Sequence, residues 1–348
     1  CGFNASIINP IITHSTKNGN IRKVKNDKID SKGIAKLGLS KDIPVSQFPA
    51  KLVLELRSLT RKYYDLTDER SAHINKLKGD LHTVFPQYLD VFCDVTGKTS
   101  TMILRQYGTP DKILRGHKKT MIEKISKASR KGLAKASERY EKLCAAANAA
   151  KTFGCQIDSI YFNIFLTLDL VEKLDSALDS ILNRIRQLIT FNKNEKFIQQ
   201  IKLLNTIPGV GFLTAVTIMC EIGDFSAFRN PKQLFAYFGL DPEVNESGKF
   251  VGTQLHMSKR GSRIARRAIF AVALASIRTK RNGEGINPYL RKYYELKSGQ
   301  KPKMVAIGAV MHKVCNIVFA VLRDEKAFEL RSPEEHCKQY QRPALAAA

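Results

Sequence analysis

The chain has 348 residues, with 57 Lys or Arg against 32 Asp or Glu, and a formal net charge of +25. This length supports two or three domains with hydrophobic cores. The charge excess is far larger than solubility requires, so it favours a nucleic-acid partner over a membrane surface. We see no apolar run of about 18 residues or more, the length typical of a membrane-spanning helix.

The seven cysteines are scattered, and none forms a C-x-x-C pair. This spacing argues against a structural zinc site. Several cysteines lie in apolar helical segments, so we interpret them as reduced core residues of a cytoplasmic protein. The chain begins with Cys1 and shows no signal-peptide pattern. Its first residues resemble the end of a buried strand, so we expect the natural protein to start upstream.

Residues 3–12 predict a short apolar strand, and a basic segment that turns helical follows it. Asp27 and Asp30 in this segment have the i, i+3 spacing that places two carboxylates on one helix face. Paired carboxylates can bind Mg²⁺ or Mn²⁺, and Lys25 and Lys28 beside them would suit a phosphate backbone. Asp at a helix start is also an ordinary cap, and for the pair taken alone this simpler interpretation is favoured.

Two segments, 49–84 and 171–188, carry apolar residues at alternating spacings of three and four, which predicts long helices of coiled-coil type. Arg70 and His73 interrupt the first stripe. We interpret the first segment as part of a packed helical pair, with a structural His73. Two such stripes indicate either an antiparallel helical arm or a dimer contact, and both interpretations stay open at this point.

The segment between Lys112 and Lys135 contains nine Lys or Arg and one acidic residue, Glu123. A charge run of this kind usually forms a solvated helix face. Because the imbalance is so one-sided, nucleic-acid binding is slightly favoured here.

From Leu203 to about residue 330 the composition predicts a compact, mostly helical unit, followed by a polar tail. We expect a buried helix after the turn that starts this unit and another apolar helix over residues 302–322. Its first turn, Ile207-Pro-Gly-Val-Gly, resembles the hairpin of a helix-hairpin-helix element. Gly209 and Gly211 would allow a tight turn, and the N–H groups at the next helix start would accept a phosphate. The alternative is an ordinary glycine-rich turn before a core helix.

Ser247 precedes Gly248 in a short acidic loop, and a basic helix is predicted to follow. A loop serine before Gly is most often a turn residue, and its hydroxyl needs activation before it can act as a nucleophile. Ser258 is predicted to be the N-cap of the basic helix. Cations spaced four apart would share one face, bind phosphate and stabilise a phosphoryl-transfer transition state. The cations at this helix start are Lys259, Arg260, Arg263 and Arg267.

Four motifs in this order resemble the insertion-sequence transposases of the "one-ten" family, now described as bridge-RNA-guided recombinases. They are K-N-D-K-I-D-S-K, I-P-G-V-G-x-x-T-A, Y-x-G-L-D-P-x-x-x-x-S-G and S-K-x-G-x-x-x-x-R. The resemblance implies a mostly α chain with a truncated α/β part. It divides the chain into a remnant of a RuvC-like (RNase H-like) domain, a helical arm, a basic segment with a second coiled-coil helix, a helical transposase domain with a helix-hairpin-helix-like element, and a polar tail. These parts are expected at residues 1–48, 49–110, 111–202, 203–330 and 331–348.

The resemblance also implies a chemistry. Ser247 would attack a DNA phosphodiester and form a covalent phosphoserine link. Asp27 and Asp30 would be the last two of four acidic residues that bind Mg²⁺ at a composite site between subunits of a dimer or tetramer. A structured guide RNA would pair with donor and target DNA. The first two acidic residues would lie before Cys1, so we expect activity from the complete protein and little from these 348 residues alone.

Two alternatives remain at the sequence level. A non-catalytic, basic nucleic-acid-binding protein would use Ser247 only as a turn residue. A metal-dependent junction nuclease of RuvC type would use carboxylates and no serine. Ser247→Ala and Asp27→Asn separate these alternatives from a serine recombinase.

Overall fold

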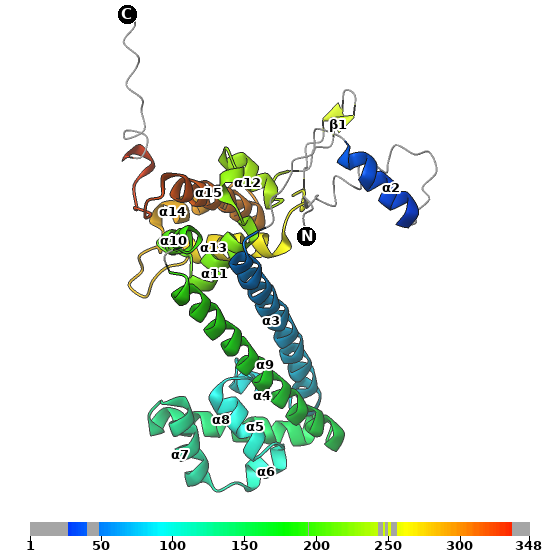
Figure 1. Ribbon diagram of the computed structural model, residues 1–348. Helices are drawn as coiled ribbons and strands as arrows, with labels where there is room; N and C mark the ends of the chain where they lie inside the picture. The colour runs from blue at the N-terminus through cyan, green and yellow to red at the C-terminus, as the bar shows by residue number, and fades with distance from the viewer. Residues whose placement is uncertain are drawn as a thin grey trace, which may run out of the picture.

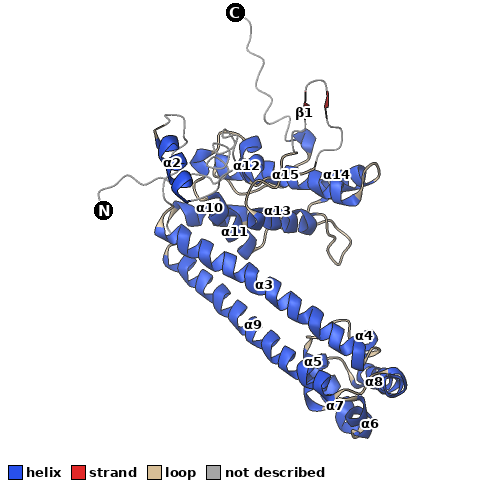
Figure 2. Cartoon of the chain, turned by 90° about the vertical axis from the view of Figure 1, so that its right-hand side faces the viewer, coloured by secondary structure: helices blue, strands red, loops and turns tan. Residues whose placement is uncertain are grey.

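The computed structural model describes residues 27–39, 49–193, 195–242, 246–247, 250–251 and 256–335. The described chain is mostly helical, as predicted, and we refer to its parts as the arm, the head and the body (Figure 1). The arm is a pair of long helices, with the head at one end and the body at the other (Figure 2). The strand expected over residues 3–12 lies outside the described residues.

The arm consists of α3 (Lys51–Val84) and α9 (Asp158–Phe191), each 34 residues long. They lie side by side and run antiparallel, because the chain leaves the body along α3 and returns along α9 (Figures 1 and 2). Arg70, which interrupts the predicted apolar stripe, forms an ion pair with Asp175 across the two helices. The stripes therefore pack against each other within one chain, as the interpretation of an antiparallel helical arm predicted. Buried stripe residues include Leu56, Leu66, Leu77, Val171, Leu178 and Ile185.

The head is the segment between the two arm helices, and it has a hydrophobic core of its own. Tyr88 lies in this core, where its hydroxyl donates to the Ser100 carbonyl oxygen at 3.0 Å. Phe85, Ile103 and Leu143 are also fully buried there. The head helices are α4 (Tyr88–Val91), α5 (Lys98–Gln106), α6 (Pro110–Arg115), α7 (Lys118–Ser129) and α8 (Leu133–Phe153).

Within its described residues, the body contains seven helical segments and one short ladder of strands. The helices are α10 (Lys196–Leu204), α11 (Phe212–Ile222), the 3₁₀ turn η2 (Phe225–Ala227), α12 (Pro231–Tyr237), α13 (Arg263–Ser276), α14 (Pro288–Ser298) and α15 (Lys303–Asp324). The strands β1 (Glu246–Ser247) and β2 (Phe250–Val251) pair antiparallel. A further helix, α2 (Asp27–Gly38), precedes the arm.

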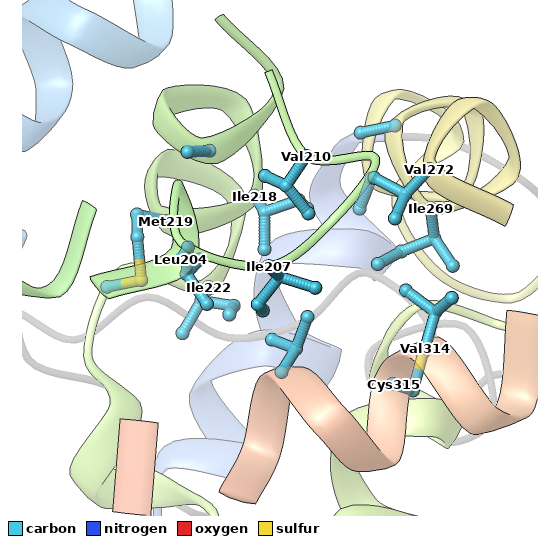
Figure 3. Packing of buried hydrophobic residues seen from close by; sticks show 14 of the residues in the cluster. Leu204, Ile207, Val210, Ile218, Met219, Ile222, Ile269, Val272, Val314 and Cys315 are labelled. Atoms are coloured by element: carbon cyan, nitrogen blue, oxygen red, sulfur yellow. The ribbon is translucent and has the colours of Figure 1, made fainter. Parts of the chain in front are cut away.

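The body core forms where α11, α13 and α15 meet, and the turn before α11 inserts into it (Figure 3). Ile207 and Val210 of that turn are buried together with Ile269 and Val272 of α13. The buried helix expected after the Ile207 turn is α11, which confirms that prediction.

The apolar helix expected over residues 302–322 is α15. It is long and apolar enough to cross a membrane, which corrects our statement that the chain has no such run. Its apolar residues, among them Val310, Val314 and Val318, are instead buried against α10, α12, α13 and α14. Cys315 of α15 and Cys220 of α11 are free and buried in this core, as expected, whereas Cys93 and Cys155 are exposed and are not core residues.

Candidate functional site

Ser247 lies on a hairpin between α12 and α13. The hairpin starts at an isolated bridge between Pro242 and Met257, and Ser247 pairs with Phe250 further along it. Ser247 is thus carried on a short ladder whose two ends are both rooted in the body. Its side chain lies outside what the structure describes.

The two stems of this hairpin cross at the glycines 239 and 261. A Cβ on Gly239, which has φ +65°, would lie 2.5 Å from the backbone N of Gly261. A Cβ on Gly261 would lie 2.1 Å from the carbonyl oxygen of Tyr237. Backbone packing at these distances leaves room only for glycine, so the two stems are held in contact.

Arg266 of α13 holds this crossing from one side. Its Nη1 donates to the carbonyl oxygens of Phe238, Lys259 and Gly261, at 3.2, 3.1 and 2.8 Å. Burial lowers the pKa of Arg266 below its ordinary value. One guanidinium therefore binds both stems of the hairpin that carries Ser247.

The start of α13 differs from the prediction. Ser258 is not the N-cap: its hydroxyl donates to Asp241 Oδ1 at 2.6 Å, and its N–H donates to the Asp241 carbonyl at 2.8 Å. Ser262 caps the helix by accepting from the N–H of Ala265 at 3.1 Å. Lys259 therefore lies before the helix, in a left-handed conformation with φ +53°, and does not share a helix face with Arg263. The spacing of four between Lys259, Arg263 and Arg267 predicted a helix that starts at Lys259. Spacing alone does not show which serine caps the helix, so it placed the helix start too early.

Glu221, at the end of α11, fixes the other side of this helix start. Its side chain is 3% exposed and accepts from Arg61 Nε and Nη2 at 2.9 and 3.0 Å and from the Ser262 hydroxyl at 2.7 Å. Burial opposes ionisation of this carboxyl, but the hydrogen bonds from Arg61 and Ser262 outweigh it, so the pKa of Glu221 is lowered. Tyr237 adds a bond from its hydroxyl to the Glu221 carbonyl at 3.0 Å. One buried carboxylate thus joins α3, α11 and the N-terminus of α13.

Two of the predicted phosphate-binding cations share a carboxylate partner on α3. Arg263 Nη2 lies 3.1 Å from Asp68 Oδ2, and Arg267 Nη1 lies 2.8 Å from Asp68 Oδ1. The Arg267 guanidinium also lies over the Tyr64 ring, 4.8 Å from its centroid. Two guanidinium groups converging on one acidic group is the arrangement that also binds a phosphate. The other two predicted cations, Lys259 and Arg260, are exposed at the base of the hairpin.

The predicted turn glycines have different surroundings. Gly209 has φ +94°, and a Cβ there would lie 2.6 Å from Ser276 Oγ of α13. The Ser276 hydroxyl donates to the Pro208 carbonyl at 3.0 Å, so this part of the turn faces the core. Gly211 precedes α11 as its N-cap, and a Cβ there would meet nothing within 4 Å. Only Gly211 therefore leaves the helix start open to a ligand.

The predicted metal ligands lie on α2. The helix includes Asp27, Lys28 and Asp30, so its backbone places the two aspartates on one face, as expected. Their side chains, and all of Lys25, lie outside the described residues. Two carboxylates supply part of the oxygen ligand set that Mg²⁺ requires. Among the residues that the structure describes, no three His, Cys, Asp or Glu side chains come together to hold a metal ion.

Sequence reasoning did not identify Glu221, Asp68 or Arg266 as organisers of this region. Glu221 was detectable in principle, because it is the one charged residue in the apolar helix Phe212–Ile222. A buried acid of that kind predicts a cationic partner. Its partner Arg61, however, lies 160 positions earlier in the chain, and no local pattern identifies it.

Comparison with known proteins gives two family matches. The family described as "Transposase IS116/IS110/IS902 family" matches residues 201–295, and a DEDD transposase family of IS110 type matches residues 1–86. The first match contains the hairpin, Arg266 and Glu221, and the second contains α2 and all of α3. These matches confirm the resemblance inferred from the sequence motifs.

Several curated proteins are similar to this chain. The "Insertion element IS110 uncharacterized 43.6 kDa protein" of Streptomyces coelicolor is 23% identical over 286 residues, which are 81% of this chain and 66% of the relative. A "Pilin gene-inverting protein" of Moraxella bovis is 30% identical over 177 residues, 51% of this chain and 52% of the relative. The "Transposase for insertion sequence element IS1111A" of Coxiella burnetii is 26% identical over 188 residues, 52% of this chain and 50% of the relative. The chain thus spans between half and two thirds of the length of these relatives.

Proposed function

We propose that this chain, which carries transposase domains of the IS110/IS116/IS902 family, is part of an enzyme that cuts and rejoins DNA through a covalent link to Ser247. The observation that carries the proposal is the anchoring of the Ser247 hairpin to a basic helix. Arg266 binds both hairpin stems, and the same helix presents Arg263 and Arg267. Phosphodiester chemistry needs a positioned nucleophile and nearby cations, and a serine on an anchored hairpin next to a basic helix supports that role.

The proposed step is a transesterification at a phosphodiester of DNA. The Ser247 oxygen forms a bond to a DNA phosphorus, the bond from that phosphorus to one deoxyribose oxygen breaks, and the departing oxygen takes up a proton as the serine loses one. Attack by the hydroxyl of another DNA end reverses the step and rejoins the strands. The phosphoserine link conserves the energy of the broken bond. Rejoining therefore needs no nucleotide cofactor.

Cations near the hairpin would serve the charge that develops on the phosphoryl oxygens. Lys259 and Arg260 are exposed at the hairpin base, so a phosphate can reach them without rearrangement of the body. Arg263 and Arg267 are held by Asp68 and would exchange this carboxylate for a phosphate. Each such exchange replaces one charge-assisted hydrogen bond with another of the same kind.

We propose Mg²⁺ as the cofactor, with Asp27 and Asp30 of α2 among its ligands and with further carboxylates completing the ligand set. When bound, the ion would polarise a phosphoryl oxygen. The support for this proposal is the helical i, i+3 spacing of the two aspartates and the match to a DEDD transposase family.

A structured guide RNA and assembly into a dimer or tetramer are also part of the proposal. A protein guided by RNA needs only shape and backbone contacts to nucleic acid, and a basic chain suits that role. A two-carboxylate half-site also needs completion, and a second subunit is one source of the missing ligands.

The test is a covalent trapping experiment with the longest natural form of the protein, cognate element RNA, Mg²⁺ and end-labelled DNA. Wild type should give a protein–DNA adduct that survives denaturation and maps to Ser247. Ser247→Ala should lose the adduct and strand exchange while it retains DNA affinity. Cleavage that persists in Ser247→Ala and is lost in Asp27→Asn would instead establish a metal-dependent nuclease. Binding without cleavage by every form, wild type included, would establish a non-catalytic role.

A further inference from the structure

The head carries a group of cations that the proposed chemistry does not use. Seven Lys or Arg lie between residues 118 and 135, on α7, on the turn after it and at the start of α8, and all seven are exposed. The same span contains one acidic residue, Glu123. These cations, which we call the head patch, are Lys118, Lys119, Lys124, Lys127, Arg130, Lys131 and Lys135.

The head patch has no acidic partners in the described part of the chain. None of its seven cations forms an ion pair there, and neither does Glu123. Cations nearby behave differently, since Lys142 pairs with Glu138 at 2.8 Å and Lys151 with Asp111 at 2.7 Å. Surfaces that serve only solubility usually mix both signs. Unbalanced, exposed positive charge concentrated in one part of a protein is the electrostatic signature of a polyanion site.

The patch is presented by a rigid helical pair. Met121 and Ile125 of α7 are fully buried in the head core, as is Leu143 of α8. Arg130 ends α7 in a left-handed conformation with φ +53°, and α8 begins directly after the next turn. Lys131 lies in the turn between the two helices, and Lys135 lies in the first turn of α8. The cations are thus arrayed on an ordered surface and not on a free tail.

The position of the head separates this surface from the serine hairpin. A helix of 34 residues spans about 50 Å, so the arm places the head far from the body. The head patch also lies outside both family matches, which end at residue 86 and begin again at residue 201. A phosphate bound by the head patch is therefore not the phosphate that Ser247 would attack.

We propose that the head patch is a second nucleic-acid-binding surface, which takes the phosphodiester backbone of a polynucleotide without reading its sequence. Lysines that act as point charges provide affinity and orientation but little base discrimination. The surface would hold nucleic acid at the far end of the arm while the body holds the reacting strand. The proposal does not depend on Ser247 chemistry.

The experiment compares two variants of the full chain in a Ser247→Ala background, so that binding is measured without cleavage. The first replaces Lys119, Lys127, Lys131 and Lys135 with Gln. The control replaces Lys62, Lys76, Lys78 and Lys173, four exposed lysines of the arm, with Gln, and so removes the same charge. Fluorescence anisotropy at several salt concentrations reports the affinity for a duplex DNA and for a duplex RNA of equal length.

The head variant should bind about tenfold to hundredfold more weakly, and its salt slope should fall by about one for each phosphate that the variant no longer binds. The control should stay within about threefold of the parent, because its cations touch no ligand in this proposal. Lys→Arg at the same four head positions should restore binding. Weakening with one probe only identifies DNA or RNA as the ligand, and weakening with both identifies the shared backbone. Unchanged affinity of the head variant for both probes, or an equal loss in the control, would overturn the proposal.

Discussion

The two ends of the arm use positive charge in opposite ways. In the body, Arg61, Arg263 and Arg267 contact carboxylates of the same chain, and Arg266 binds backbone carbonyls. In the head, the seven cations of the head patch contact no carboxylate within the described residues. These four arginines of the body therefore build and orient a site, whereas the cations of the head patch are left without carboxylate partners in the described chain. A chain's net charge alone does not distinguish these two uses.

The largest effect should come from removing the carboxylate that organises the body. Glu221→Ala leaves Arg61 without its partner and removes a hydrogen bond from the helix cap. We expect the free energy of unfolding to fall by about 3 kcal/mol, the low end for a broken buried pair, because half-exposed Arg61 regains water. Urea unfolding measures this change. Glu325→Ala breaks the surface pair with Lys196 and should cost less than about 1 kcal/mol. Equal losses would show that the body's charges are no more structural than surface ones.

The two glycines of the turn before α11 allow a packing role and a binding role to be tested separately, because Gly209 faces the core and Gly211 does not. Gly209→Ala forces a Cβ against Ser276 at a backbone angle that disfavours side chains, and should destabilise by about 2 kcal/mol. Gly211→Ala meets no neighbouring atom and should cost less than about 1 kcal/mol. Thermal unfolding compares the two. A loss of DNA affinity in the stable Gly211 variant would support phosphate binding at this helix start, and unchanged affinity would count against it.

The carboxylate shared by Arg263 and Arg267 provides a direct test of the comparison between body and head. Asp68→Asn should release both guanidinium groups, raise nucleic-acid affinity by about threefold to tenfold and steepen the salt slope by about one. Glu69→Gln makes the same change of charge one residue away, at an exposed side chain that has no ion pair within the described chain. Titrations of both variants with duplex DNA measure the difference. If the affinity for DNA rises equally in the two variants, the change in net charge alone explains the effect, and Asp68 does not keep Arg263 and Arg267 from binding nucleic acid.

The smallest effect concerns pH. Because the pKa of Glu221 is lowered in the folded protein, the unfolded state takes up the proton first as pH falls. The stabilisation is fully present at neutral pH and is lost as pH falls below the ordinary glutamate value of 4.5. The stability difference between wild type and Glu221→Gln should therefore narrow between pH 7 and pH 4. Urea unfolding at the two pH values checks this, and a widening difference would mean that the carboxylate is not stabilised by its partners.

Long amphipathic elements of this fold were predictable from the sequence. The stripe of α3 repeats over many turns, so periodicity located almost the whole helix, but for α9 it located only residues 171–188 and missed the first part of the helix. The apolar helices α11 and α15 were also predictable. The head was not foreseen as a compact unit, because α4, α5 and α6 have only four to nine residues each. Helices that short are stabilised by tertiary contacts and leave little periodic signal.

The candidate site was predictable only in part. The motif around Ser247 identified the hairpin and the basic helix, but the true N-cap, Ser262, depends on a hydrogen bond to Glu221 from a different helix. Arg266 likewise binds three carbonyl oxygens only because Gly239 and Gly261 bring the two hairpin stems together, and the spacing of residues in the sequence does not reveal that contact. Contacts between residues far apart in the chain set these features, and local propensity carries no information about them.

The length of the arm has a geometrical consequence for the head. Three contacts hold the base of the arm against the body. Arg57 donates to the Cys220 carbonyl oxygen at 2.7 Å, Arg61 pairs with Glu221, and Asp68 pairs with Arg267. Since the arm is about 50 Å long, a tilt of about 5° at this base moves the head by about 4 Å, close to one base-pair step of a duplex. If a phosphate replaced Asp68 as the partner of Arg263 and Arg267, one of these contacts between the arm and the body would be lost. Under the proposed function, binding of a DNA strand by the body would then displace the head at the other end of the arm.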